Sequence, residues 1–263
     1  MPRLAVLGHP VAHSRSPAMH AAALADLGLA ADWTYEAIDV APDEFEALVH
    51  TMPGQGFAGV NVTVPHKGAA LTVADNPSET AREIGAANTL SFLGGEVSAD
   101  NTDAPAVLDS LANSPEGSRA LVLGAGGAAR AVVWALVREG AEVAVWNRTA
   151  LRSANLCEEL GGQPVEELDQ GEFDLIVNAT AVGLQGESAF DELPLRADGF
   201  AAGQTVVDMV YADAPTELLA AASAGGATVI DGIEVLVRQG AHSLRIWTGR
   251  EPSLDAMRAA ARS

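Results

Sequence analysis

The chain has 263 residues, of which 35 are aspartate or glutamate and 15 are lysine or arginine, giving a formal net charge of −20. Such acidity, with no basic stripe, argues against binding to nucleic acid or to an anionic membrane surface. No apolar run reaches the roughly 18 residues of a membrane span, and the N-terminus runs directly into a strand-like stretch, so we expect no membrane helix and no signal peptide. The single cysteine, Cys157, excludes an internal disulfide and should be a buried apolar residue on a helix. A cytoplasmic protein is the simplest expectation.

Strand-like and helix-like stretches alternate along the first hundred residues, which is typical of an α/β fold with mainly parallel strands. The sequence predicts strands at 3–8, 33–40 and 56–64, helices at 16–29, 43–52 and 78–85, a short helix from Lys67, and two strands within 86–103 around a Gly-Gly turn.

A second series of the same kind begins near residue 103. It predicts helices at 103–113, 127–140, 150–161, 216–226, 233–249 and 253–262, and strands at 119–124, 142–147, 173–180, 204–211 and 227–232. We therefore expect two α/β units joined near 101–103, with the two C-terminal helices free to pack on either.

A glycine-rich turn lies between a strand and a helix of the second unit, in "ALVLGAGGAARAVVWAL". Gly124 and Gly126 allow a tight turn and the close approach of a pyrophosphate, which would sit at the N-terminus of the helix that begins with Gly127. Ala129 replaces the third glycine of the usual fingerprint and is still small enough for close packing. The context favours dinucleotide binding over a purely structural turn.

The next strand bears on the choice between NAD and NADP. A site for NAD of this kind usually has an acidic residue about 20 positions beyond the glycines, on the ribose 2′-hydroxyl. Here the strand ends in Asn147, Arg148 and Thr149, followed by Arg152, so the acid is missing and two guanidiniums are present. This pattern favours the 2′-phosphate of NADP. The alternative is a pair of solvated arginines at a helix start, where the helix dipole disfavours cations.

The first unit contains a second group of polar residues. Ser16 before Pro17 is a good N-cap, but Ser14 is left unexplained, and a helix start with two hydroxyls also suits a carboxylate. Both readings of the serines stay open. Candidate strand ends carry further hydroxyl, amide and charged groups, namely Asn61, Thr63, Lys67, Asn88 and Asp103. Since such ends line the ligand crevice of open α/β sheets, the residues suggest a small polyhydroxylated substrate.

Lys67 is the only lysine among 15 basic residues. Unlike arginine, lysine can release its proton, so its retention raises the possibility of proton transfer at this position. The six histidines show no familiar zinc spacing, and with one cysteine we expect no metal site.

Taken together, "GHPVAHSRSPAMH", "GVNVTVPHK", "GAANTL", "DNTD", "GAGGAAR", "NRTALR", "NAT", "DMVY" and "GIEVLVRQGA" resemble, in this order, the motifs of the shikimate dehydrogenase family. The resemblance spans residues 5 to about 249. It implies NADPH-dependent, reversible reduction of 3-dehydroshikimate to shikimate. It also implies two α/β domains: a substrate domain at 1–101 plus 235–263, to which the C-terminal helices return, and a Rossmann-type NADP domain at 102–234.

The resemblance also implies a role for each motif residue. Lys67 and Asp103 would form the catalytic pair, and Ser14 with Ser16 would hold the substrate carboxylate. The other substrate contacts would be Asn61, Thr63, Asn88, Tyr211 and Gln239. The cofactor contacts would be Gly124, Gly126, Gly127, Ala128, Asn147, Arg148, Thr149, Arg152 and Gly232. The sequence departs from the family pattern at Ala21, Leu184, Asp213 and Val235.

Two alternatives to this function stay open. One is a quinate/shikimate dehydrogenase of the same fold that uses NAD. The other, from a different class, is a non-catalytic NADP-sensing module, which would need the glycine turn and the arginines but not Lys67 with Asp103. The partner expected in every case is a small molecule, and the protein would be a monomer or a homodimer.

Overall fold

The structure, a computed structural model, describes residues 1–212 and 214–263, so Asp213 lies outside it. Residue contacts group the chain into unit 1, Met1–Ala106 with Leu236–Ser263, and unit 2, Val107–Val235. Both borders fall inside helices, α5 (Asp103–Ser110) and α10 (Gly232–Thr248), rather than in the loops just before them. Helical periodicity runs on through such a border, so the sequence does not mark it.

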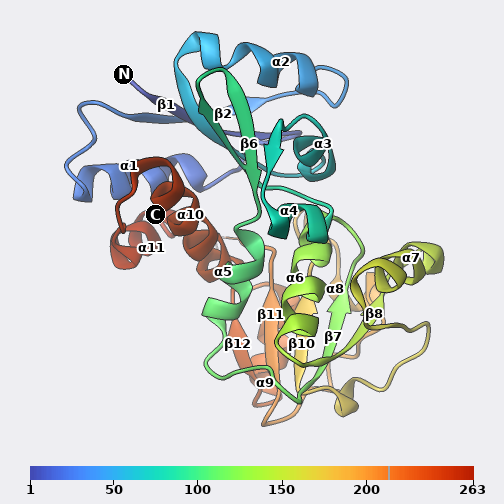
Figure 1. Cartoon of the computed structure of the whole chain (residues 1–263). Helices are drawn as coiled ribbons and strands as arrows, with labels where there is room; N and C mark the ends of the chain where they lie inside the picture. The colour runs from blue at the N-terminus through green and yellow to red at the C-terminus, as the bar shows by residue number, and fades with distance from the viewer. Residues whose placement is uncertain (213) are drawn as a thin grey trace. The chain divides into compact units, whose positions relative to one another are not determined.

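Unit 1 is built on a mixed sheet. Its strands are β1 (Arg3–Gly8), β2 (Thr34–Asp39), β3 (Phe57–Val62), β4 (Asn76–Pro77), β5 (Thr89–Leu93) and β6 (Glu96–Asp100). Their order is β2-β1-β3-β5-β6-β4. Figure 1 labels β1, β2 and β6 of this sheet. β1 is parallel to β2 and β3, whereas β5 is antiparallel to β3 and β6. The strand pair around the Gly-Gly turn is thereby confirmed.

This topology collects the predicted substrate residues at one edge of the sheet. The carboxyl ends of β1, β3 and β6 and the amino end of β5 all meet there, because β5 runs opposite to its neighbours. The segments that leave or enter at this edge contain Ser14 and Ser16 after β1, Lys67 after β3, Asn88 before β5 and Asp103 after β6.

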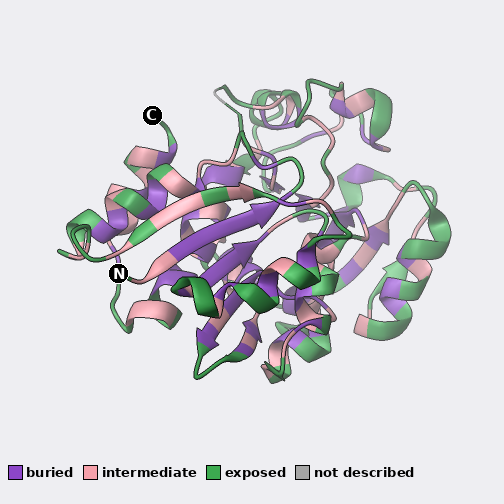
Figure 2. Cartoon of the chain, turned by 90° about the horizontal axis from the view of Figure 1, so that it is seen from above, coloured by how far each residue is buried: buried purple, intermediate pink, exposed green. Residues whose placement is uncertain are grey.

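Helices cover the sheet of unit 1 and bury its apolar side chains. Phe45 and Val49 of one helix, both at most 1% exposed, join a core cluster with strand residues such as Leu7 and Val60. Figure 2 shows central strands in the buried colour and many exposed positions on the outer faces of helices. The helices wholly in unit 1 are α1 (Ser16–Asp26), α2 (Phe45–Thr51), α3 (Lys67–Thr72), α4 (Glu79–Ile84) and α11 (Leu254–Ala261), with a 3-10 turn at Pro53–Gln55.

Unit 2 has a sheet whose strand pairs are all parallel among the described residues. Its strands are β7 (Arg119–Leu123), β8 (Glu142–Trp146), β9 (Gln163–Pro164), β10 (Leu175–Asn178), β11 (Thr205–Asp208) and β12 (Thr228–Ile230). Their order is β12-β11-β10-β7-β8-β9. If the six strands are numbered 1 to 6 along the chain from β7, the order read from β9 is 3-2-1-4-5-6. This is the strand order of Rossmann-type dinucleotide domains. Successive strands are added on one side of β7 up to β9 and on its other side from β10 onward, so the strand order reverses between β7 and β10.

The helices of unit 2 pack on this sheet. They are α6 (Gly127–Arg138), α7 (Ala150–Leu160), α8 (Ala189–Glu192) and α9 (Glu217–Ala224), with a 3-10 turn at Gln170–Glu172. Cys157 is buried on α7, as expected. No helix in the described part of the chain combines the length and apolar character needed to cross a membrane.

The sequence-based expectations fail at one cap and at three very short elements. Ser16 is the first residue of α1 and the cap position falls on Arg15, so the predicted Ser16 cap is wrong. Pro17 is tolerated throughout a first helical turn, and it therefore does not fix the start of the helix to one residue. The short elements β4, β9 and α8 were not predicted, because two to four residues are too few to show a periodicity.

Candidate active site

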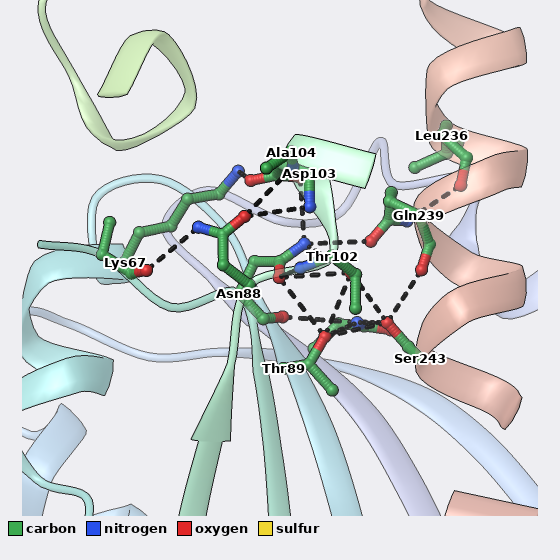
Figure 3. A network of polar contacts seen from close by, with 12 residues as sticks. Lys67, Asn88, Thr89, Thr102, Asp103, Ala104, Leu236, Gln239 and Ser243 are labelled. Carbon is green, nitrogen blue, oxygen red and sulfur yellow. Dashed lines mark hydrogen bonds and ion pairs between the residues drawn. The ribbon is translucent and has the colours of Figure 1, made fainter. Parts of the chain in front are cut away.

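Lys67 and Asp103 form an ion pair in unit 1. Lys67 Nζ donates to Asp103 Oδ2 at 2.5 Å, and the two side chains are only 12% and 5% exposed (Figure 3). Lys67 is the first residue of α3, and its carbonyl accepts the N–H of Ala87 at 2.9 Å, which fixes α3 against the segment before β5. The pair is therefore anchored at both ends and shielded from water. Charge-assisted hydrogen bonds are strong in such a shielded environment.

The loop after β6 holds Asp103 by its backbone. Asn101 Oδ1 accepts the backbone N–H of Asp103 at 3.1 Å and of Ala104 at 3.2 Å, which caps the start of α5. Asn101 itself is tied to the carbonyl of Ala86 at 2.9 Å. These bonds are the local reason why the "DNTD" motif presents a carboxylate at this edge.

Asn88 connects the ion pair to the rest of the edge. Its Nδ2 donates to Asp103 Oδ1 at 2.9 Å and contacts Gln239 Oε1 of α10 at 3.3 Å (Figure 3). Lys67, Asn88, Asp103 and Gln239 are thus gathered in one network, although they are far apart in the sequence.

The remaining predicted substrate residues of unit 1 lie on the same segments. Thr63 follows β3, and a Cβ at Gly8 would lie 2.5 Å from Thr63 Cγ2, so the glycine leaves room for this threonine. Ser16 is buried, and its N–H donates to Ser14 Oγ at 3.3 Å. Asn61 is buried with both ends of its amide bonded: Oδ1 accepts from Tyr35 at 2.8 Å and Nδ2 donates to Ser243 Oγ at 2.8 Å.

His20 lies behind this edge, fully buried on α1. Its ring stacks on Tyr35 with centroids 4.1 Å apart and planes 5° from parallel. Burial lowers the pKa of His20 to about 3 and outweighs the opposing effect of the neighbouring Asn61 amide. His20 is therefore neutral at physiological pH.

In unit 2 the glycine turn after β7 has the geometry that dinucleotide binding requires. Gly124 has φ +114°, a conformation that favours glycine, and a Cβ there would lie 3.1 Å from the carbonyl oxygen of Ala179. A Cβ at Gly126 would meet nothing within 4 Å, so the space in front of α6 is open. Ala129 is fully buried on α6, consistent with close helix packing at the third fingerprint position.

A pocket of about 410 Å³ opens beside the carboxyl ends of β8 and β10. This volume falls within the range of small-molecule sites. Asn147 and Arg148 line it after β8, and Thr180 lines it after β10. Arg148 is 85% exposed, and its guanidinium lies 3.6 Å from Glu192 Oε2, which lines the same pocket. Two acidic residues, Glu187 and Glu192, therefore line this pocket; they come from the segment before α8 and from α8, not from the end of β8, where a site for NAD would usually carry one.

The other predicted cofactor residues of unit 2 have clear local roles. Asn147 Nδ2 donates to the carbonyl of Thr149 at 3.0 Å, and Thr149 occupies the N-cap position of α7, on whose first turn Arg152 is exposed. A Cβ at Gly232 would lie 2.6 Å from the carbonyl oxygen of Val210, so packing alone accounts for that glycine. Tyr211 follows Val210 after β11 and is half-buried.

Comparisons with known proteins identify the family of this chain. Residues 6–90 match the model of the shikimate dehydrogenase substrate binding domain, residues 107–184 that of shikimate / quinate 5-dehydrogenase, and residues 232–262 that of the shikimate 5′-dehydrogenase C-terminal domain. A shikimate dehydrogenase (NADP(+)) of Thermus thermophilus is 47% identical, covering 100% of this chain and 98% of the relative. That of Anaeromyxobacter dehalogenans is 45% identical over 97% of this chain and 94% of the relative.

The chain belongs to the shikimate dehydrogenase family. A solved structure agrees, that of shikimate 5-dehydrogenase from Thermus thermophilus in complex with NADP(H) and shikimate. It superposes with a TM-score of 0.91 at 45% identity and covers 100% of this chain and 99% of that chain.

Sequence reasoning missed several residues that the structure places in contact with the predicted ones. Ser243 was recognisable, because it lies four residues after Gln239 and so on the same face of α10. Thr89 and Thr102 neighbour predicted residues but were covered only by the expected strand pair within 86–103. Glu192 left no signal, because only the folded chain brings α8 to Arg148. Among the described residues, no three His, Cys, Asp or Glu side chains gather as metal ligands.

Proposed function

We propose that this chain catalyses the reversible, NADPH-dependent reduction of 3-dehydroshikimate to shikimate. The observation that carries the proposal is the shielded Lys67–Asp103 pair at 2.5 Å, within a chain that is 47% identical to a relative named for this reaction. The Rossmann-type strand order of unit 2 and its glycine turn support the cofactor part of the proposal.

NADPH, when bound, supplies a hydride to the carbonyl carbon of the substrate. Lys67 donates a proton from Nζ to the carbonyl oxygen as negative charge develops there, so the C=O bond becomes a CH–OH group. Asp103 accepts one of the three ammonium N–H groups and orients the others. Lys67 then regains its proton from solvent, and the reverse reaction uses the neutral amine as a base.

The edge residues of unit 1 would bind the rest of the substrate. Ser14 and Ser16 hold the carboxylate in this proposal, at the start of α1. Thr63, Asn88, Asp103 and Gln239 bind ring hydroxyls in this proposal, and Tyr211 remains a predicted substrate contact. Asn61 already has partners at both ends of its amide, so we assign it to the support of this edge rather than to a contact that must form anew.

The cofactor residues act through shape and charge. The turn formed by Gly124, Gly126, Gly127 and Ala128 accepts the pyrophosphate at the N-terminus of α6. Arg148 and Arg152 pair with the 2′-phosphate, while Asn147 and Thr149 shape the loop between β8 and α7. Gly232 adds the tight packing that begins α10. The proposal includes a cytoplasmic location and a monomer or homodimer.

The experiment compares initial rates for four combinations, shikimate or quinate with NADP or NAD. We expect the highest kcat/KM for shikimate with NADP. A preference for quinate with NAD would instead identify the NAD-linked alternative. Binding of NADPH without turnover of any of these acids would identify an NADP-sensing module.

A further inference from the structure

Ser243 is a junction that no part of the proposed mechanism uses. It is 0% exposed and lies one helical turn after Gln239 on α10. Its Oγ is 2.8 Å from Asn61 Nδ2, 2.8 Å from Thr89 Oγ1 and 3.1 Å from Thr102 Oγ1 (Figure 3). A single hydroxyl thus connects α10 with β3, β5 and the loop after β6.

The direction of these bonds follows from donor and acceptor chemistry. The carbonyl of Gln239, 2.9 Å from Ser243 Oγ, can only accept, so the one Ser243 proton is directed to it. Asn61 Nδ2 can only donate, and it takes one lone pair of Ser243. Thr89 Oγ1 is closer to Ser243, at 2.8 Å, than to Asn88 Oδ1, at 3.3 Å, so Thr89 donates to Ser243. Ser243 therefore accepts from Asn61 and Thr89 and directs its own proton to the Gln239 carbonyl.

The orientation of Asn88 depends directly on Thr102, whose hydroxyl oxygen in turn lies 3.2 Å from that of Thr89. The backbone N–H of Thr102 donates to Asn88 Oδ1 at 2.7 Å. Because an N–H can donate only to the oxygen, this bond fixes which side of the Asn88 amide carries the oxygen and which carries the nitrogen. Asn88 Nδ2 then faces Asp103 Oδ1 and also donates to Thr102 Oγ1 at 2.9 Å. Both threonine hydroxyls that touch the Asn88 amide, those of Thr89 and Thr102, are in contact with Ser243.

We propose that Ser243 is a positioning residue for the reaction: it holds the Thr89 hydroxyl, Thr89 holds the hydroxyl of Thr102 at 3.2 Å, and Thr102 holds the Asn88 amide, which orients the Asp103 carboxylate toward Lys67. This inference rests on the proposed function. Proton transfer requires tighter geometry than binding, and small misplacements of a catalytic group reduce turnover strongly. Loss of the Ser243 acceptor should therefore lower kcat more than it raises the KM for 3-dehydroshikimate.

The test measures steady-state kinetics and thermal melting of Ser243→Ala. We expect kcat to fall by about tenfold, with the KM for 3-dehydroshikimate changed by less than about threefold and the KM for NADPH unchanged. Ser153→Ala is the matched control, because that hydroxyl is also buried and donates to a backbone carbonyl, of Ala150 at 2.8 Å, outside this network. Its kcat should equal that of the parent.

A double variant separates positioning from general loosening of the fold. In a Lys67→Arg background the proton donor is already lost, so adding Ser243→Ala should lower kcat by less than about twofold. Should Ser243→Ala not fold, Thr89→Val removes the strongest threonine donor to Ser243 while keeping its shape, and it should show the same fall in kcat.

Three outcomes would overturn the positioning role: parental kcat in a folded Ser243→Ala, parental kcat in a folded Thr89→Val, or losses that multiply fully in the double variant. Failure of the proposed function is distinguishable from these, because it appears as absent turnover in the parent chain itself.

Discussion

At the scale of single residues, the central feature is the ammonium of Lys67 held against Asp103. Both side chains are shielded, so removing one partner leaves a buried charge that nothing compensates. Lys67→Ala therefore combines a loss of chemistry with a loss of stability, on the order of 3 kcal/mol. Lys67→Arg keeps the charge balance and is the cleaner test of proton transfer.

We expect kcat of Lys67→Arg to fall by about 10²–10⁴-fold, because arginine has a pKa above about 12 and donates a proton poorly. Binding of NADPH, measured by a fluorescence titration, should stay close to that of the parent. Thermal melting provides the control that the variant is folded. Near-parental turnover would leave position 67 as a positive charge without a role in proton transfer.

Ser14 should act in binding rather than in chemistry. Ser14→Ala should raise the KM for shikimate more than it changes kcat, because an anchor for the carboxylate acts equally in the ground state and the transition state. Steady-state kinetics with shikimate and with an analogue that lacks the carboxylate provide the measurement. If Ser14→Ala discriminates against that analogue as strongly as the parent does, the carboxylate is bound elsewhere.

These residues show what the sequence can and cannot predict of the site. The motifs predicted Lys67, Asn88, Asp103 and Gln239, and the fold brings all four into one network. The cap assigned to Ser16 was wrong, because a proline in the first turn does not fix the start of a helix. The junction at Ser243 needed the structure, since its hydrogen bonds exist only once two strands, a loop and a helix meet.

At the scale of elements, the β8–α7 loop, α8 and the segment before α8 all contribute charged side chains to the proposed cofactor pocket. The sequence indicated arginines without an acid, but α8 places Glu192 3.6 Å from Arg148. A 2′-phosphate would have to displace this carboxylate from the guanidinium. The pair is largely solvent-exposed, so the competition is worth less than about 1 kcal/mol.

Arg148→Ala should weaken NADPH binding by about tenfold and leave NADH binding almost unchanged, because only NADPH carries the 2′-phosphate. Titrations with the two cofactors measure both affinities. The same comparison can be made with two fragments of the cofactors: 2′,5′-ADP, which carries the 2′-phosphate, and 5′-AMP, which lacks it. If Arg148→Ala loses as much affinity for NADH as for NADPH, or as much for 5′-AMP as for 2′,5′-ADP, Arg148 does not contact the 2′-phosphate.

Glu192→Gln should have the opposite effect on the same titration. Removing the carboxylate frees Arg148 and relieves repulsion of the 2′-phosphate, so NADPH should bind up to about fivefold more tightly while NADH is unaffected. Asp191→Asn, an exposed neighbour on the same helix, is the matched control. Tighter binding in the control as well would attribute the effect to net charge rather than to Glu192.

The order of the elements was largely predictable because long strands and helices carry clear periodicities. The helices and strands of six residues or more were all anticipated, with ends shifted by a few positions. The two-residue strands β4 and β9 were not, because pairing with a neighbour, rather than their own pattern, makes them strands. The short Gly-Gly turn between β5 and β6 makes these two strands antiparallel.

At the scale of the whole molecule, the buried His20 couples folding to pH. Its pKa is about 3 in the fold and 6.5 unfolded, so between these values the unfolded chain binds the extra proton. Stability should therefore fall as the pH falls below about 6.5, by about 1.4 kcal/mol per pH unit from this residue alone. The loss should continue until the pH approaches the folded value.

Chemical denaturation at several pH values measures this dependence. His20→Phe keeps an aromatic ring on Tyr35 but cannot titrate, so its free energy of unfolding should fall less steeply from about pH 6 to about pH 4. The comparison uses slopes, because the larger ring also changes the packing. If the free energies of unfolding of the parent and of His20→Phe change in parallel with pH, then His20 binds its proton equally well in the folded and the unfolded chain.

This chain should act as a catalyst rather than as a cofactor-binding module, and a single-turnover experiment tests this claim most directly. The intact chain, in excess over one equivalent of NADPH, is mixed with 3-dehydroshikimate, and the loss of NADPH absorbance is compared with the shikimate formed. We predict one shikimate for each NADPH consumed, with Lys67→Arg binding NADPH but converting it at least about a hundredfold more slowly. NADPH that is bound by the parent chain and remains unconsumed would contradict the account.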